Sequence, residues 1–178
     1  DLIKRDAAVD IAECGTKASL LAAIDARGIV LDVDVADRTV SYGTVVDRLF
    51  KRVSRPKIVQ PLFVTGHPVD VSPLARRSDT DAATVDRFQL VVNGWEIVNA
   101  YSELIDPLDQ RQRLESQAEA RAAGDHETME MDEDFLLCME HGMPPMSGWG
   151  MGIDRLVALL TDAETLRAVV LFPLMRPE

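Results

Sequence analysis

Two short segments of the chain carry the side chains that could do chemistry. The first is rich in β-forming residues and also holds a set of polar ones: Gln89, Glu96, Asn99, Tyr101 and Glu103. The second, residues 148–156, spaces three glycines two residues apart and places an arginine just after them. Because alternate side chains of a strand share a face, the first segment could form a pocket floor with acceptors for a cationic ligand. Together the two segments predict a site for a cation and a polyphosphate.

Strand alternation alone does not bring all the acidic side chains together. Asn99, Tyr101 and Glu103 share a face, whereas Glu96 is seven residues from Glu103 and would face the other side of an ideal strand. A β-bulge or a strong twist could bring Glu96 into the same cavity. A solvent-facing edge strand would also explain Asn99 and Glu103. In a ligand site, Glu103 would accept an ammonium group, since a buried carboxylate is costly unless it is paired.

Glu96 and the glycine segment suit the polyphosphate side of such a site. The carboxylate of Glu96 is an oxygen donor of the kind that Mg²⁺ takes when it also bridges phosphate oxygens. Gly148, Gly150 and Gly152 leave one face bare, so a ligand could approach the backbone, although tight helix packing is an equal explanation. Arg155 could pair with a neighbouring acidic residue, but its position favours contact with a nucleotide phosphate or base.

The composition indicates one soluble globular domain. The chain has 178 residues, of which 47% are hydrophobic and 28% charged. Its net charge of −11 opposes a broad electrostatic contact with nucleic acid. The two cysteines are far apart, which favours neither a disulfide framework nor a zinc site. No long apolar run or signal peptide is present, so we expect a cytoplasmic protein with no membrane contact.

The surrounding pattern predicts an α+β fold, a mostly antiparallel sheet flanked by helices. Asn93 and Gly94 separate two β-rich runs and predict a hairpin, because both turn positions favour positive φ. We expect the helix at 107–123 to be exposed and the strand at 58–65 to be buried. Strands are expected at 28–33, 58–65, 87–92, 95–104 and 148–152. Helices are expected at 17–27, 42–53, 107–123, 132–141, 153–160 and 164–169.

With these motifs in this order, the chain resembles the C-terminal part of the catalytic domain of class II lysyl-tRNA synthetases. The matching segments are Ser72-Pro-Leu-Ala-Arg76, Asp86-Arg-Phe88, Asn99-Ala-Tyr-Ser-Glu-Leu104, Asp106-Pro107, Gln110-Arg-Gln-Arg113, Asp132-Glu-Asp-Phe135, Gly142-Met-Pro-Pro145, the glycine segment to Leu156, and Phe172-Pro-Leu-Met-Arg-Pro177. The resemblance implies that residues 56–178 are the core with the third motif of the class. Residues 1–55 match loosely and would be a peripheral segment of the same domain.

The resemblance implies a lysine-tRNA ligase, in which lysine attacks the α-phosphate of ATP and the lysyl group then passes to tRNA-Lys. By position, Glu103 and Tyr101 would recognise the lysine ammonium, while Asn99 and Gly150 would hold the rest of the amino acid. Such catalysis depends on positioning and charge stabilisation rather than on a protein nucleophile.

The same resemblance implies which residues bind ATP. Glu96, Gly152 and Arg155 would bind ATP, and Arg155 would be the catalytic arginine of the third motif. Glu96 and Gln89 would hold Mg²⁺, but Gln89 stands where the family usually has a glutamate, which would weaken or rearrange that metal site. Trp149 replaces a usual leucine, and Asp70 a common glutamate.

The chain begins at Asp1 and lacks the family's anticodon-binding barrel and its first and second motifs. We therefore expect a piece of a longer protein, homodimeric at full length, that binds ATP weakly and is inactive alone. Two alternatives stay open. A paralogue could transfer lysine to a protein or lipid with the same Glu103 and Arg155, or a non-catalytic interaction module could descend from such an enzyme and tolerate Gln89.

Overall fold

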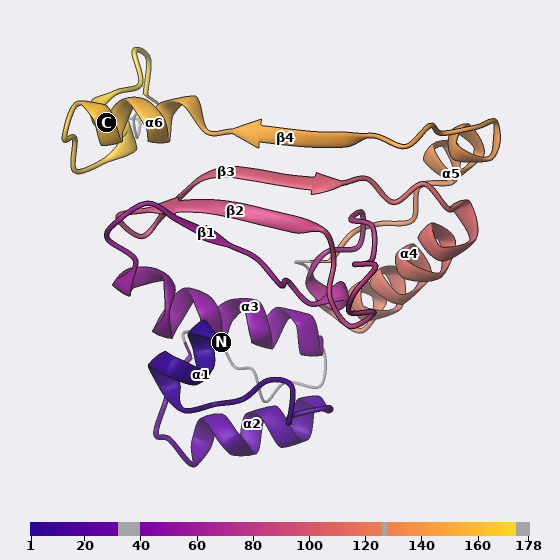
Figure 1. Cartoon of the computed structure of the whole chain (residues 1–178), viewed down its shortest axis with the longest axis horizontal. Helices are drawn as coiled ribbons and strands as arrows, with labels where there is room; N and C mark the ends of the chain where they lie inside the picture. Colours follow the sequence, from indigo (N-terminus) through magenta and orange to yellow (C-terminus); the bar gives the residue numbers. More distant parts are fainter. Residues whose placement is uncertain (32–39, 126–127, 174–178) are drawn as a thin grey trace, which may run out of the picture.

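The computed structural model describes residues 1–31, 40–125 and 128–173, and its centre is a four-stranded antiparallel sheet (Figure 1). The strands lie in chain order: β1 (Leu62–Val64), β2 (Arg87–Val92), β3 (Trp95–Ser102) and β4 (Ser147–Met151). Asn93 and Gly94 have φ values of 49° and 73°, as the predicted tight hairpin between β2 and β3 requires. The predicted α+β class is confirmed.

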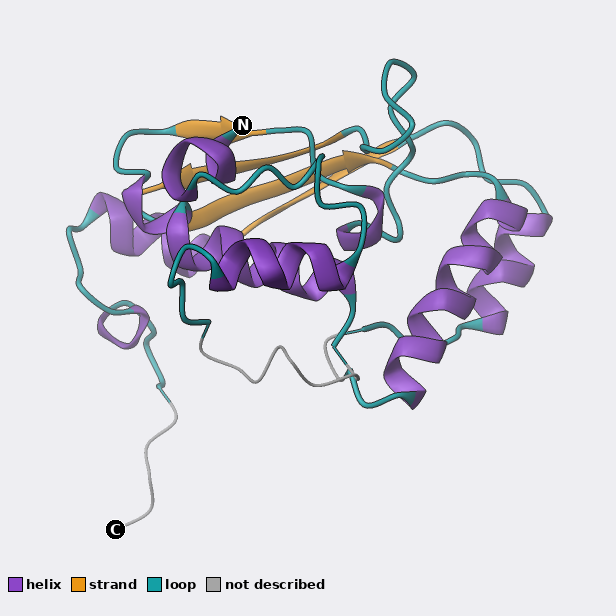
Figure 2. Ribbon diagram, turned by 90° about the horizontal axis from the view of Figure 1, so that it is seen from below, coloured by secondary structure: helices purple, strands orange, loops and turns teal. Residues whose placement is uncertain are grey.

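Helices surround this sheet on one face and at its ends (Figures 1 and 2). The α-helices of the described residues are α1 (Leu2–Ala7), α2 (Lys17–Asp25), α3 (Tyr42–Val53), α4 (Pro107–Ala122), α5 (Glu133–Glu140) and α6 (Ile153–Leu160). Short 3-10 turns are η1 (Arg55–Lys57), η2 (Val69–Val71) and η3 (Leu166–Ala168). In the described parts of the chain, no helix combines the length and the apolar character needed to cross a bilayer.

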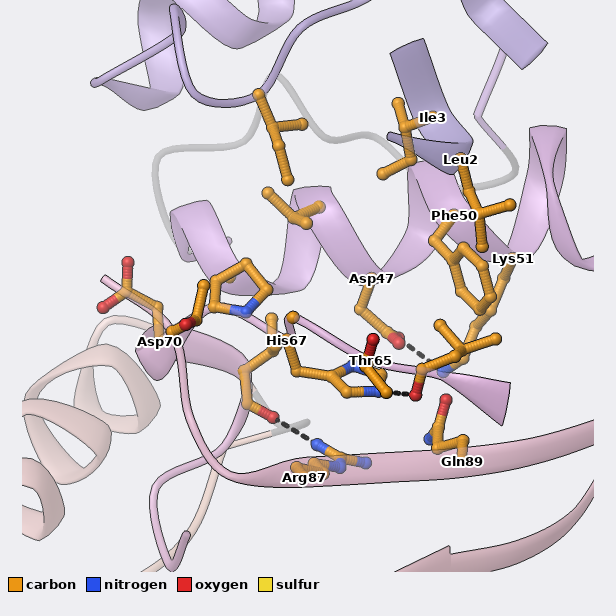
Figure 3. A pocket seen from close by; sticks show the side chains of 18 of the residues that line it. Leu2, Ile3, Asp47, Phe50, Lys51, Thr65, His67, Asp70, Arg87 and Gln89 are labelled. Atoms are coloured by element: carbon orange, nitrogen blue, oxygen red, sulfur yellow. Dashed lines mark hydrogen bonds and ion pairs between the residues drawn. The ribbon is translucent and has the colours of Figure 1, made fainter. Parts of the chain in front are cut away.

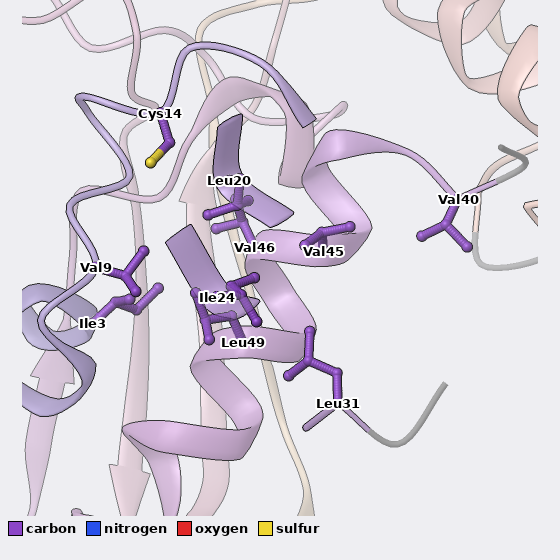
Figure 4. Packing of buried hydrophobic residues seen from close by; sticks show 10 residues of the cluster. All are labelled: Ile3, Val9, Cys14, Leu20, Ile24, Leu31, Val40, Val45, Val46 and Leu49. Atoms are coloured by element: carbon purple, nitrogen blue, oxygen red, sulfur yellow. The ribbon is translucent and has the colours of Figure 1, made fainter. Parts of the chain in front are cut away.

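Helices α1 to α3 form a layer with its own core against the β1 side of the sheet (Figure 4). Its ten buried members are Ile3, Val9, Cys14, Leu20, Ile24, Leu31, Val40, Val45, Val46 and Leu49. A second cluster joins this layer to the sheet, because Phe50 of α3 packs against buried Val64 and Val91. The predicted apolar stripe of α3 therefore holds the helical layer over the β1 and β2 end of one sheet face.

Gly43 allows α3 to approach the 3-10 turn η2 closely. A Cβ atom built on Gly43 would lie 2.8 Å from the carbonyl oxygen of Asp70, which is backbone and cannot rotate away. We expect Gly43→Ala to lower the free energy of unfolding by about 1–3 kcal/mol through overpacking. Gly15→Ala is the control, because a Cβ on Gly15 meets no atom within 4 Å. Chemical denaturation of both variants tests this, and equal midpoints would contradict it.

Several sequence predictions were wrong in detail. The run at 58–65 is not a buried strand: only Leu62–Val64 is extended, and Leu62 and Phe63 are 38% and 62% exposed because β1 is an edge strand. Residues 28–31 form no strand, and the rest of that expected element lies outside the described residues. The expected last helix is only the short turn η3. Helix α4 is not simply exposed, since it buries Gln110 and Arg113.

Candidate active site

A β-bulge in β3 places Glu96 on the same face as the other polar side chains. Val98 pairs with Leu90 but Glu96 pairs with Val91, so Ile97 is an extra residue in β3. Residues paired directly across an antiparallel ladder share a face. Because Asn99 pairs with Gln89, the bulge lets Glu96 join that face although it lies three residues away. The structure thus contains the β-bulge that the sequence required if Glu96 and Asn99 were to share a face.

The glycines of β4 lie opposite these side chains and leave space for them. Gly148 pairs with Tyr101 and Gly150 with Asn99, so both glycines present their bare side to the polar face. A Cβ on Gly148 would lie 2.6 Å from Oε1 of Glu103, so a larger residue there would require that carboxylate to move. A Cβ on Gly150 would meet nothing within 4 Å, which leaves open space beside Asn99. This bare backbone suits close approach of a ligand.

Glu103 is a half-buried carboxylate that no protein cation neutralises. Its backbone lies just beyond β3 and is held by a hydrogen bond from its N–H to the Met146 carbonyl, 3.0 Å. Within the described residues its side chain forms no ion pair and accepts no hydrogen bond. Burial therefore raises the pKa of Glu103 above its ordinary value, and burial followed by the Glu103 charge raises the pKa of Tyr101. A cationic ligand would remove the cost of this unpaired charge.

The side chain of Arg155 lies next to Glu96. Arg155 is the third residue of α6, and its Nη1 donates a hydrogen bond to the backbone carbonyl of Glu96, 2.8 Å. A Cβ on Gly152 would lie 3.2 Å from Cδ of Arg155, so the glycine gives this arginine room to lie back over β4. No ion pair with the adjacent acidic residue forms in the part of the chain described here. Arg155 is exposed, which leaves its remaining N–H donors available to phosphate.

Gln89 and Glu96 form a hydrogen-bonded pair on this face. Nε2 of Gln89 donates to Oε2 of Glu96 at 2.8 Å, so Oε1 of Gln89 is the atom left for a ligand. Among the described residues, no group of three or more His, Cys, Asp or Glu side chains could hold a metal by itself. One carboxylate and one amide oxygen fit an Mg²⁺ ion that is shared with substrate phosphates, not one caged by protein alone.

A cavity lies beside this face, between α3, the N-terminal segment and the β1 and β2 end of the sheet (Figure 3). Its volume is about 840 Å³, and Gln89 and Arg87 form the wall nearest the polar residues. His67 also lines it, and burial, with a smaller effect of Arg87, lowers the pKa of His67 to about 4. Since Nε2 of His67 lies 3.2 Å from the Val64 carbonyl, the ring is neutral with its proton on Nε2 near pH 7.

Cavity size alone does not identify the site. Asn99, Tyr101, Glu103 and Arg155 lie outside the lining of this cavity, on the more open β3 and β4 part of the face. The convergence of unpaired polar groups is the better guide, because a ligand-binding face needs donors and acceptors left free by the protein. Arg87 was not among the predicted site residues, yet this partly buried arginine of β2 donates a hydrogen bond to Asn99, 2.9 Å.

The fold and this face agree with the comparison of the sequence with known families. Residues 15–176 match the family described as tRNA synthetases class II (D, K and N). The match covers most of the chain, and the chain belongs to this family of class II tRNA synthetases.

Three similar proteins are each described as a lysine–tRNA ligase. The one from Pelotomaculum thermopropionicum is 46% identical over 177 residues, which are 99% of this chain and 34% of that protein. The one from Synechococcus sp. RCC307 is 46% identical over 178 residues, 100% of this chain and 35% of that protein. The one from Leuconostoc mesenteroides is 52% identical over 136 residues, 76% of this chain and 28% of that protein. The chain thus spans 35% or less of the length of these three relatives.

Proposed function

We propose that the protein carrying this chain is a lysine–tRNA ligase. It activates lysine with ATP to give lysyl-adenylate and pyrophosphate, and then transfers the lysyl group to tRNA-Lys. The chain supplies the floor of the amino-acid site and one side of the nucleotide site. The observation that carries the proposal is the half-buried carboxylate of Glu103, which has no cationic partner among the described residues and lies at Gly148, the residue paired with Tyr101.

The charge of Glu103 bears on the choice of amino acid. The matching family includes enzymes for aspartate, lysine and asparagine, so membership alone does not select one of them. An unpaired carboxylate repels an aspartate side chain, and an asparagine amide offers it hydrogen-bond donors but no opposite charge. The ammonium of lysine offers both donors and the opposite charge, so the carboxylate favours lysine. Tyr101 lies on the same face and helps to orient that ammonium.

The nucleotide side depends on Arg155, Glu96 and the bare backbone around Gly152. Arg155 stabilises negative charge on the phosphates, and its hydrogen bond to the Glu96 carbonyl fixes where its guanidinium stands. When Mg²⁺ is bound with ATP, it offsets phosphate charge. Glu96 and Oε1 of Gln89 are the protein oxygens that would hold it.

By resemblance to its relatives, we place the full-length protein in the cytoplasm as a homodimer with lysine, ATP and tRNA-Lys as its substrates. The proposal is tested with the full-length protein by amino-acid-dependent exchange of pyrophosphate into ATP, followed by transfer to tRNA. Lysine should support exchange, whereas aspartate and asparagine should not. Exchange that depends on aspartate or asparagine, or activated lysine that passes to a protein or lipid but not to tRNA, would contradict the proposal.

Gln89→Glu tests the metal side. The change puts a second carboxylate where the Gln89 amide now donates to Glu96, so the two charges repel each other unless a cation lies between them. We expect the Mg²⁺ concentration for half-maximal exchange to fall on the order of tenfold, because an added carboxylate strengthens a site for a hard cation. In chelator, the variant should unfold at a lower temperature than the unchanged protein.

The matched control for this prediction is Gln112→Glu, which adds the same charge at an exposed position of α4. It should leave both the Mg²⁺ requirement and the unfolding temperature unchanged. If Gln89→Glu behaves like this control, residue 89 takes no part in metal binding.

A further inference from the structure

We propose that Arg87 is a positioning residue that fixes the amide of Asn99, so that Asn99 offers its N–H donors to the carboxyl end of the bound amino acid. The inference rests on the proposed function and deepens it. It gives a role to three segments that have none in the site described above. They are the loop at 72–75, the arginine before Phe88, and the polar stretch at the start of α4.

Arg87 is held on one side by the loop and reaches Asn99 on the other. Its Nη1 donates to the carbonyl of Val71, 3.0 Å, and to Oγ of Ser72, 2.8 Å. Its Nε donates to Oδ1 of Asn99, 2.9 Å. With three hydrogen bonds from one planar group, the guanidinium has a fixed orientation.

The chemistry of arginine decides which way the Asn99 amide faces. A guanidinium has only donors, so the Asn99 atom that meets it must be the oxygen. The amide nitrogen Nδ2 is then turned away, and it has no hydrogen-bond partner within the described residues. Gly150, paired with Asn99 across β4, leaves open space beside this group. Asn99 therefore presents donors and recognises an acceptor, which on lysine is the carboxylate and not either ammonium group.

The loop that holds Arg87 is itself fixed by buried polar side chains of α4. Arg113 donates to the carbonyl of Ala75, 2.7 Å, while its guanidinium pairs with Asp109, 2.8 Å. Gln110 donates to the carbonyl of Pro73, 3.2 Å. These partners satisfy loop carbonyls that would otherwise be buried unpaired, so the loop is a rigid support. The contacts run from α4 through the loop to Arg87 and end at Asn99.

The test compares lysine with 1,5-diaminopentane, which keeps the side-chain ammonium but lacks the carboxylate. Both are measured on the full-length protein, lysine by its KM and the diamine by its inhibition constant in the exchange reaction. We expect Arg87→Met to raise the KM for lysine roughly tenfold while the inhibition constant of the diamine stays the same. Glu103→Gln should weaken both compounds, because it acts on the end that they share.

A double variant separates positioning from general support. If Arg87 acts through Asn99, Arg87→Met adds nothing to the KM for lysine once Asn99→Ala is present. Ser72→Ala removes one anchor of Arg87 and should give a smaller change with the same selectivity for lysine over the diamine; it replaces Arg87→Met if that variant does not fold. Arg111→Met is the control, since Arg111 lies on α4 with an ion pair to Glu133 away from this face.

Equal weakening of lysine and the diamine by Arg87→Met, or additive effects with Asn99→Ala, would overturn the role of Arg87 and leave the proposed function standing. Failure of the unchanged protein to use lysine at all would overturn the proposed function. The two failures are therefore distinguishable.

Discussion

Glu103→Gln in the full-length protein is expected to raise the KM for lysine by roughly thirtyfold, equivalent to about 2 kcal/mol. The amide keeps the shape of the side chain but removes the negative charge that pairs with the ammonium, so an ion pair becomes a hydrogen bond to a neutral oxygen. Because Gly148 leaves room for the carboxylate, the glutamine fits without displacing the backbone. Lysine-dependent exchange measures the effect, and Glu119→Gln at an exposed position of α4 is the matched control.

The same variant separates a binding role from a structural one. Burial raises the pKa of Glu103, so the folded protein holds this proton more tightly than the unfolded chain. The stability contributed by the group is therefore present at pH below the unfolded pKa and is lost as pH rises through the folded pKa. At neutral pH the ionised carboxylate is a cost, and Glu103→Gln should unfold at the same or a higher temperature. An unchanged KM for lysine, or a clear loss of stability, would contradict the assignment.

Acidification gives a second measure of Glu103. Lysine binding should weaken when Glu103 gains a proton. Because the pKa of Glu103 lies above its ordinary value, this weakening should begin at a higher pH than it would for an unperturbed glutamate. This dependence should disappear in Glu103→Gln, which has no proton to gain. A pH profile of the KM for lysine that is the same in both proteins would exclude Glu103 as its source.

Arg155→Ala is expected to lower the rate constant of lysine-dependent pyrophosphate exchange by roughly a hundredfold or more, as loss of a preorganised charge at a reacting phosphate does. The KM for lysine should change little, because Arg155 lies beside Glu96 and not beside Glu103. Arg155→Lys keeps the charge but loses the planar group, so it should recover only part of the rate.

An exposed arginine elsewhere on the molecule is the control for that prediction. Arg27, which follows α2, is exposed, and Arg27→Ala should leave exchange unchanged. Because Arg155 is also exposed, its removal should not alter thermal unfolding. A rate within a factor of about two of the unchanged protein would show that Arg155 does not act on the phosphates.

Much of the fold followed from local sequence signals. Asn93 and Gly94 determine the hairpin because few other residues accept positive φ at both positions. The stripe of α3 and the glycines before α6 were likewise visible. The exposure of an apolar run was not visible in this way. The pattern of Leu62 and Phe63 is the same at an edge as at the centre of a sheet, and their exposure depends on the strand order and on which residues other elements cover.

The site was less predictable than the fold for two physical reasons. A bulge changes which residues share a face without leaving a clear signal in composition, so the position of Glu96 depended on a register that appears only across the ladder. The role of Arg87 depends on hydrogen bonds to a loop fifteen residues earlier in the chain. An arginine inside an otherwise β-rich run was the available signal, since such a residue is buried only when its donors are satisfied.

The extra residue in β3 divides that strand into two halves with opposite phase. With this residue in place, Glu96 before it and Asn99 and Tyr101 after it lie on one face of the sheet, where we propose that the nucleotide and amino-acid sites meet. A regular ladder through the same residues would instead pair Ile97 with Val91 and turn Glu96 to the face that carries Phe63. The bulge therefore lets one short strand offer groups to both proposed substrate sites.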